Sequence, residues 1–178
     1  TLDGVNVYSS VSGKNVSLNK AKLPVSASKL GAREMILSTA DIDYKFTADI
    51  YTLKISNKAE FDKMRDLARS NGDVTNTGVF DGYFVLDGNI EYNAEFVSMT
   101  DSGEIWSINN KLGGAGWNDP SRYGFKGVFD GRGYNVNGIT VKARTGDKES
   151  GGVFGFTNND AIIKNVSFTD AGLYENNG

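Results

Sequence analysis

The stretch Gly127-Val128-Phe129-Asp130-Gly131 decides the fold, because the chain uses it more than once. The same word stands at Gly78–Gly82, and an altered copy, Gly-Val-Phe-Gly-Phe, stands at Gly152–Phe156. The interval from Gly78 to Gly127 is close to twice the interval from Gly127 to Gly152, as expected for two units and one unit of the same length. Repetition at such a period predicts a solenoid, in which each coil buries its apolar face against its neighbours.

A second repeated pattern supports this period. Tyr134–Val141 matches Ala161–Phe168 when Tyr134 is aligned with Ala161, with apolar residues at the third, sixth and eighth places. This alignment predicts that Gly138 and Asn165 occupy the same bend. Short strands with Gly or Asn corners, at roughly 22 to 27 residues per coil, are typical of a parallel β-helix. Leucine-rich repeats have a similar period, but their Leu-x-x-Leu-x-Leu pattern is missing.

One helix is predicted, over Asn57–Ser70. Asn57 followed by Glu60 forms a capping box, and Gly72 supplies a left-handed stop. The apolar face of this helix contains Phe61, Met64, Leu67 and Ala68. Because the open end of a β-stack is an aggregation-prone edge, we expect the helix to cover that end.

The segment 1–54 is predicted to form a separate β-module. Tyr44, Phe46, Ala48 and Ile50 occupy alternate positions, as in a half-buried strand, and turn signals separate four or five such strands. This spacing is typical of a small antiparallel sandwich, although a complete one has about seven strands, so the module is reduced or truncated. We therefore divide the chain into 1–54 and 55–178, and expect the second part to continue beyond the C-terminus.

The composition excludes several classes of function. The 178 residues include 22 Gly but only 2 Pro, which favours a folded, turn-rich chain. With 0 His and 0 Cys, Ser-His-Asp and Cys-His nucleophiles, Cys/His zinc sites and disulfides are all absent. A net charge of -3 without blocks of either sign argues against nucleic acid as a partner. No apolar run approaches the ~20 residues of a membrane span.

The repeat also carries a family resemblance. Phe125–Tyr134, Gly152–Gly155 and Ile163–Val166 resemble the repeat of bacterial surface proteins with GLUG-type motifs, and Ile55–Ile90 resembles their opening segment. Asp43–Tyr51 is similar to the last strand of a bacterial Ig-like domain, which often precedes such repeats. The resemblance implies an all-β protein: a small Ig-like β-sandwich module, then the start of a right-handed parallel β-helix capped by one α-helix. It also implies a secreted or cell-wall-attached bacterial protein with adhesive or unknown roles, and it brings no catalytic residues.

A segment that interrupts the repeat supplies the candidate ligand-binding residues. Asp101–Tyr123 carries both tryptophans, and flat aromatic rings beside amides and carboxylates can stack on sugars while binding their hydroxyl groups. Trp106 alternates with isoleucines and is predicted to pack in a strand. The residues predicted to contact a glycan are Trp117, Asn118, Asp119 and Tyr123.

Other polar motifs have simpler interpretations. Asp130 is expected to cap its own turn, with Gly131 and Gly133 at positive φ, because no helix follows that could present amides to a phosphate. Asp41 and Asp43 could hold Ca²⁺ through oxygen ligands, but two solvated carboxylates are the default, and the metal content stays unknown. We expect no cofactor.

Three functions remain open at this stage. The first is a non-catalytic segment of a bacterial cell-surface or secreted protein, an adhesin or display scaffold that contacts glycan or a host surface protein. The second is a truncated β-helix polysaccharide lyase or glycoside hydrolase, since β-helices also host such enzymes. The third is a purely structural spacer. The oligomeric state is not predicted.

Overall fold

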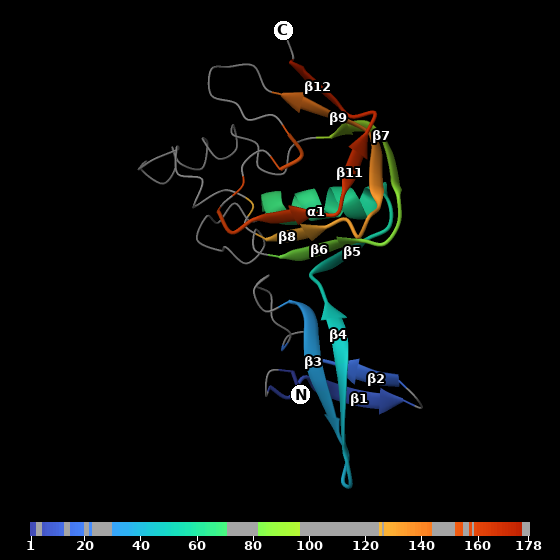
Figure 1. The fold of residues 1–178 in the computed structure, drawn as a ribbon, viewed down its shortest axis with the longest axis vertical. Helices are drawn as coiled ribbons and strands as arrows, with labels where there is room; N and C mark the ends of the chain where they lie inside the picture. The colour runs from blue at the N-terminus through green and yellow to red at the C-terminus, as the bar shows by residue number, and fades with distance from the viewer. Residues whose placement is uncertain are drawn as a thin grey trace.

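A computed structural model describes residues 1–2, 5–12, 15–19, 22, 30–70, 82–96, 125, 127–143, 152–154, 157 and 159–175. The described part of the chain is mostly β-structure with one short helix, as predicted for an all-β protein (Figure 1). Its elements are β1 (Tyr8–Ser12), β2 (Asn15–Leu18), β3 (Gly31–Ser38), β4 (Asp43–Ile50), β5 (Leu53–Ile55), α1 (Lys58–Ser70), β6 (Tyr83–Leu86), β7 (Ile90–Phe96), β8 (Val128–Asp130), β9 (Asn135–Ala143), β10 (Ile162–Lys164), β11 (Ser167–Thr169) and β12 (Gly172–Glu175).

The N-terminal elements form two antiparallel hairpins, β1–β2 and β3–β4. Leu2 and Val7 pack with Met35 of β3 in a small core, which Ala48 and Ile50 border. The predicted strand over Tyr44–Ile50 is confirmed, but its expected burial is wrong for Tyr44 and Phe46, which are exposed. Among the described residues, the small core takes in Ala48 and Ile50 of this strand but neither Tyr44 nor Phe46.

The C-terminal elements form two sheets whose strands pair in parallel. One sheet has the order β10-β8-β6-β5. In the other sheet β9 is the central strand. One of its edges pairs with β7, and the other pairs first with β11 and then, further along, with β12. The apolar side chains of both sheets share one core, in which Phe84, Phe129 and Val136 are fully buried.

Helix α1 begins where the capping box predicts, although the Glu60 side chain reaches back to Ser56 and not to Asn57 itself. The Oδ1 atom of Asn57 accepts a hydrogen bond from the Glu60 N–H (3.0 Å), while the Glu60 carboxylate accepts one from the Ser56 N–H (2.7 Å). Phe61 and Met64 are fully buried in the core. Gly72 and the side chains of Leu67 and Ala68 lie outside the described residues.

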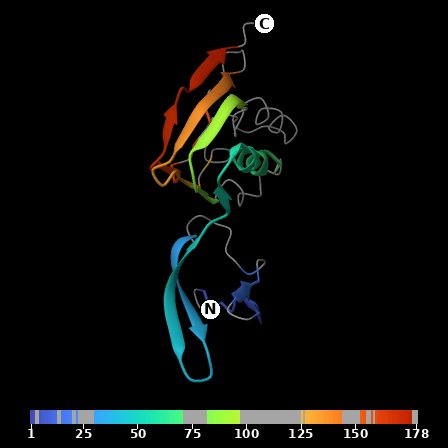
Figure 2. The ribbon, with the colours of Figure 1, turned by 90° about the vertical axis from the view of Figure 1, so that its right-hand side faces the viewer.

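The helix covers the edge strands β5 and β7. The ring of Phe61 meets those of Tyr92 and Phe96 at 5.8 and 5.4 Å between centroids. In Figure 2 the strands β7, β9 and β11 follow one another away from the helix. The helix therefore lies against one edge strand of each parallel sheet. Among the described residues, the one helix falls short of the length and apolarity that a membrane-spanning helix needs.

The strand register corrects the predicted alignment of the repeats. Val136 lies opposite Phe168 rather than opposite Ile163, so the pairing of Tyr134–Val141 with Ala161–Phe168 is wrong. Paired side chains are 32 residues apart between Asn137 and Thr169, and 46 apart between Glu91 and Asn137. The misalignment arose because Tyr134–Val141 runs largely along β9, whereas Ala161–Phe168 turns a corner between β10 and β11.

Bends in the second sheet also differ from the prediction. Gly138 (φ 68°) lies against Asn93 (φ 45°) of β7, and the constant register places it beside Asp170 (φ 47°). Asn165 (φ 54°) instead turns the corner between β10 and β11. Gly, Asn and Asp tolerate the left-handed conformation better than other residues, which explains their use at these points.

Candidate functional site

The predicted glycan-contact residues lie outside the described part of the chain. This applies to Trp117, Asn118, Asp119 and Tyr123, and also to Trp106. Asp43 begins β4 and Asp41 lies in the preceding turn, both exposed. Among the described residues, no three acidic side chains come together as a metal site would require.

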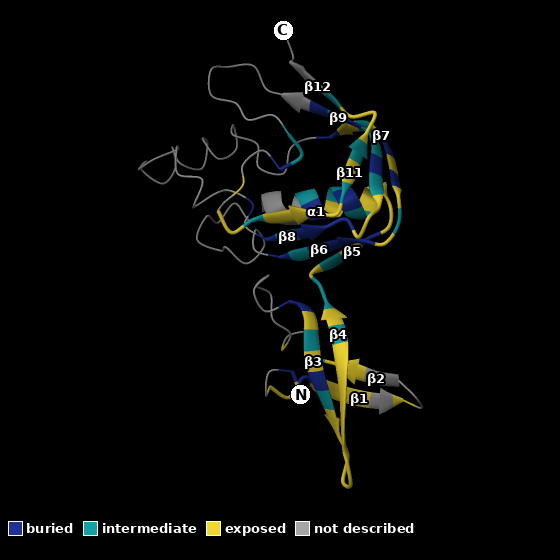
Figure 3. Cartoon of the chain, in the orientation of Figure 1, coloured by how far each residue is buried: buried dark blue, intermediate teal, exposed yellow. Residues whose placement is uncertain are grey.

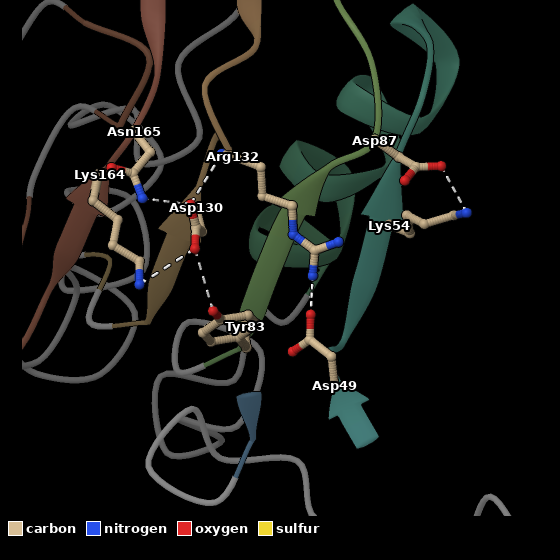
Figure 4. A network of polar contacts seen from close by, with 8 residues as sticks. All are labelled: Asp49, Lys54, Tyr83, Asp87, Asp130, Arg132, Lys164 and Asn165. Carbon is tan, nitrogen blue, oxygen red and sulfur yellow. Dashed lines mark hydrogen bonds and ion pairs between the residues drawn. The ribbon is translucent and has the colours of Figure 1, made fainter. Parts of the chain in front are cut away.

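The described residues with the densest polar contacts surround Asp130, at the end of β8. Its side chain is buried, with 8% of the residue exposed. Oδ1 accepts hydrogen bonds from the Arg132 N–H (2.9 Å) and from Nδ2 of Asn165 (3.1 Å). Oδ2 accepts one from the Tyr83 hydroxyl (3.4 Å) and lies 3.3 Å from Nζ of Lys164 (Figure 4). Both carboxylate oxygens are therefore occupied by groups of the protein.

The strand register brings these groups together. Tyr83 begins β6, Asp130 ends β8 and Lys164 ends β10, and these three strands are neighbours in one sheet. Lys164 lies directly opposite Asp130 in the register. Asn165 follows at the corner, where its positive φ turns the chain. Three neighbouring strands thus contribute to a single polar cluster.

The electrostatics of the cluster favour a charged Asp130. Burial by itself raises the pKa of the carboxyl, but hydrogen bonds from the Arg132 N–H, Asn165 and Lys164, with the charge of Lys164, outweigh it. The pKa of Asp130 therefore lies below its ordinary value of 3.8. Burial also raises the pKa of Tyr83 above 10.0, so its hydroxyl keeps its proton at neutral pH. At neutral pH, a charged acceptor beside a protonated donor suits a structural contact better than proton transfer.

The turn that follows Asp130 was predicted only in part. The hydrogen bond from the Arg132 N–H confirms that Asp130 caps its own turn. Positive φ occurs at Arg132 (52°) and Gly133 (86°), so the prediction was right for Gly133 and wrong for Gly131. Gly131 is needed for another reason: a Cβ there would overlap the Asn165 carbonyl oxygen and Val166, at the corner after β10.

Arg132 connects this cluster to the N-terminal hairpins. Its guanidinium forms an ion pair with Asp49 of β4 and lies over the ring of Tyr51, 5.8 Å from the centroid. The adjacent Thr52 donates its N–H to the Tyr83 carbonyl (2.7 Å) and accepts the Tyr83 N–H at its hydroxyl (3.0 Å). We call the contacts of Asp49, Tyr51 and Thr52 with Tyr83 and Arg132 the joint.

A second ion pair lies in the sheet that contains β5 and β6. Nζ of Lys54 on β5 is 2.7 Å from Oδ2 of Asp87, just after β6. The hydrogen bond and the charge of Asp87 raise the pKa of Lys54 above its ordinary value. Both side chains are well exposed, so this pair contributes little to stability.

The partners of Asp130 were not predicted from the sequence. The repeated word around Asp130 is visible in the sequence, but Tyr83 and Lys164 lie far from it in the chain, and only the pairing of strands brings them together. Polar residues that end β8 and β10 are a signal that could have indicated the contact of Asp130 with Lys164, whereas Tyr83 begins its strand and carries no such signal. None of the family models, curated proteins and solved structures with which the chain was compared matches it.

Proposed function

We propose that the chain is a non-catalytic segment of a bacterial cell-surface or secreted protein, an adhesin or display scaffold that contacts a glycan or a host protein. The observation that carries this proposal is the state of Asp130. It is a buried, charged carboxylate, and its two oxygens are taken up by Tyr83, Arg132, Lys164 and Asn165. Such a carboxylate has no lone pair directed at a substrate.

We further propose that the two parallel sheets are the start of a right-handed parallel β-helix, and that the hairpins before it are a reduced Ig-like module. The resemblance of Phe125–Tyr134 to GLUG-type repeats supports this, as do parallel pairing at 32 residues and the helix over the first edge. Separate cores for the hairpins and the parallel sheets support a division close to the predicted boundary at 54, although β5 (Leu53–Ile55) already belongs to the second part. A stack of this kind gives a rigid base for a loop that binds.

The glycan contact is assigned to Trp117, Asn118, Asp119 and Tyr123. We propose that the Trp117 ring stacks on a sugar face while the amide and carboxylate groups bind its hydroxyls. This arrangement would leave the coils to act as support and the inserted segment to act as the recognition element.

The test is one incubation of the protein with a panel of polysaccharides in the presence of Ca²⁺. We expect a polysaccharide to retain the protein without release of reducing or unsaturated ends, and expect Trp117→Ala to abolish retention. Tyr8→Ala is the matched control, because it removes an exposed aromatic ring from β1 instead. Release of product would overturn the non-catalytic proposal, whereas no retention would favour a protein receptor or a spacer.

A further inference from the structure

The N-terminal hairpins and the parallel sheets form two parts with separate cores. Figures 1 and 2 show them as two bodies that the chain joins between β4 and β5. One core surrounds Met35 and the other surrounds Phe61, and among the described residues no core residue belongs to both. Relative motion is the expected behaviour of two such parts unless a large apolar interface joins them.

The connection between the two parts consists of Tyr51 and Thr52, which follow β4 and precede β5. Neither residue is buried (Figure 3). Thr52 is fixed to the parallel sheets, because its N–H and its hydroxyl both form hydrogen bonds with the backbone of Tyr83. Tyr51 is therefore the residue whose backbone angles can change while the strands on both sides stay paired, as at other hinges.

The contact beside this hinge on the β3 side is small. Gly31 begins β3 and pairs with Ile50 at the end of β4. A Cβ on Gly31 would lie 3.7 Å from the Tyr83 ring, but glycine has no side chain to interlock with that ring. The contact of Gly31 with Tyr83 therefore offers little resistance to rotation of the hairpins.

Arg132 restrains the hairpins through charge. Its N–H donates to Oδ1 of Asp130 (2.9 Å), which fixes its backbone to the parallel sheets. Its guanidinium extends to the hairpins, where it pairs with Asp49 of β4 and lies 5.8 Å from the centroid of the Tyr51 ring. The side chains of Arg132 and Asp49 are 32 and 43% exposed, so dissolved ions weaken their attraction.

We propose that the two hairpins form an arm that rotates about Tyr51, and that the ion pair of Arg132 with Asp49 is a salt-sensitive latch on this arm. At low ionic strength the latch is closed and the arm has the orientation of Figure 1. At high ionic strength the latch opens, while the hydrogen bonds of Thr52 keep the pivot in place. Neither core is disrupted, so the change of orientation requires no unfolding.

Single-molecule energy transfer tests the latch, with fluorescent labels on cysteines at Ile42 of the arm and Ile163 of β10, since the chain has no cysteine of its own. Raising the NaCl concentration from about 0.01 M to about 1 M shortens the Debye length from roughly 30 Å to roughly 3 Å. We expect one narrow distance distribution at low salt. The ratio of open to closed molecules should rise with salt, by up to about fivefold, as the strength of exposed ion pairs allows.

Asp49→Asn is the decisive variant, because it removes the charge of the latch at an exposed position and keeps the shape of the side chain. We expect its distribution at low salt to match that of the wild type at high salt, with no further response. Glu34→Gln is the matched control: it removes an exposed negative charge from the same hairpin, where Glu34 lies 3.9 Å from Lys45. It should respond to salt as the wild type does.

Circular dichroism checks that each variant is folded. A wild-type distribution that stays the same from low to high salt would overturn the proposal. A salt response of Asp49→Asn equal to that of the wild type would also overturn it, as would a loss of the response in Glu34→Gln.

Discussion

The backbone of Gly127 packs directly against Gly82, which precedes the neighbouring strand β6. The Gly82 carbonyl accepts a hydrogen bond from the Val128 N–H (2.9 Å), and a Cβ on Gly127 would overlap that carbonyl oxygen. Because the atoms in the way belong to the backbone, no side-chain rotation relieves the contact. The glycine at the start of the repeated word is therefore required by the spacing between neighbouring strands.

Gly127→Ala should lower the free energy of unfolding by about 1 to 3 kcal/mol, as overpacking does in a tightly packed core. Urea denaturation measures the effect. Gly88→Ala is the matched control, because nothing lies within 4 Å of a Cβ at that position, and it should be neutral or slightly stabilising. Equal effects of the two substitutions would show that the close approach of Gly127 and Gly82 is not a constraint.

Asp130→Asn should lower stability by about 1 to 3 kcal/mol at pH 7, because it replaces a buried charged acceptor that Lys164 and three hydrogen bonds satisfy. The pKa of Asp130 is lowered in the folded state, so its contribution is complete above the unfolded value near 3.8 and disappears as the pH falls through the folded value. The gap between variant and wild type should therefore close in acid. Denaturation curves from pH 7 to pH 2 measure it, and a constant gap would contradict the assignment.

Tyr92→Phe should lower stability by about 1 kcal/mol, the usual loss for one buried hydrogen bond. The Tyr92 hydroxyl donates to Oδ1 of Asp62 on α1 at 2.6 Å. Burial, followed by this bond, raises the pKa of Tyr92 far above its ordinary value. Thermal unfolding compares this variant with Tyr8→Phe, an exposed position that should show no change. Equal losses of stability in the two variants would show that the hydrogen bond from Tyr92 to Asp62 does not stabilise the fold.

Arg132→Asn should loosen the joint while leaving stability within about 1 kcal/mol, because exposed ion pairs contribute little and Asn tolerates the positive φ of Arg132. Fluorescent labels on cysteines at Ile42 and Ile163 report the distance between the β3–β4 hairpin and the parallel sheet that contains β10. At nanomolar concentration the distance distribution should broaden in the variant. Lys54→Gln breaks an exposed ion pair within the stack and should leave the distribution unchanged. Broadening in both variants would show that the Arg132 pair has no special role.

Local signals in the sequence predicted the elements better than their partners. The helix over Lys58–Ser70 follows from the cap at Asn57 and from an apolar face that begins at Phe61. Both signals are local in the sequence. The register of β9 and β11 could not be derived in this way, because Val136 and Ile163 occur in similar local patterns on different sheets. A corner at Asn165 changes the sheet without changing the alternation of apolar residues.

The cluster around Asp130 shows the same limit. Its cap to Arg132 is local and was predicted, whereas the contacts with Tyr83 and Lys164 depend on which strands become neighbours. The exposure of Tyr44 and Phe46 was also missed, since alternation indicates a face that can be buried but does not supply the layer that buries it. The glycan-contact assignment at Trp117 stays a prediction.

The unequal spacing of the paired strands has a consequence for how such a chain can change. Residues in contact on neighbouring strands are 31 apart between Thr52 and Tyr83, 46 apart between Glu91 and Asn137, and 32 apart between Asn137 and Thr169. The strands nevertheless pair in parallel, so the connections between them can differ in length while the same strand residues stay paired. A foreign peptide added between Phe96 and Phe125 would lengthen the connection that gives the widest of these separations, the one between Glu91 and Asn137. The connections of this chain can therefore change in length and sequence, whereas the paired strands have to keep theirs.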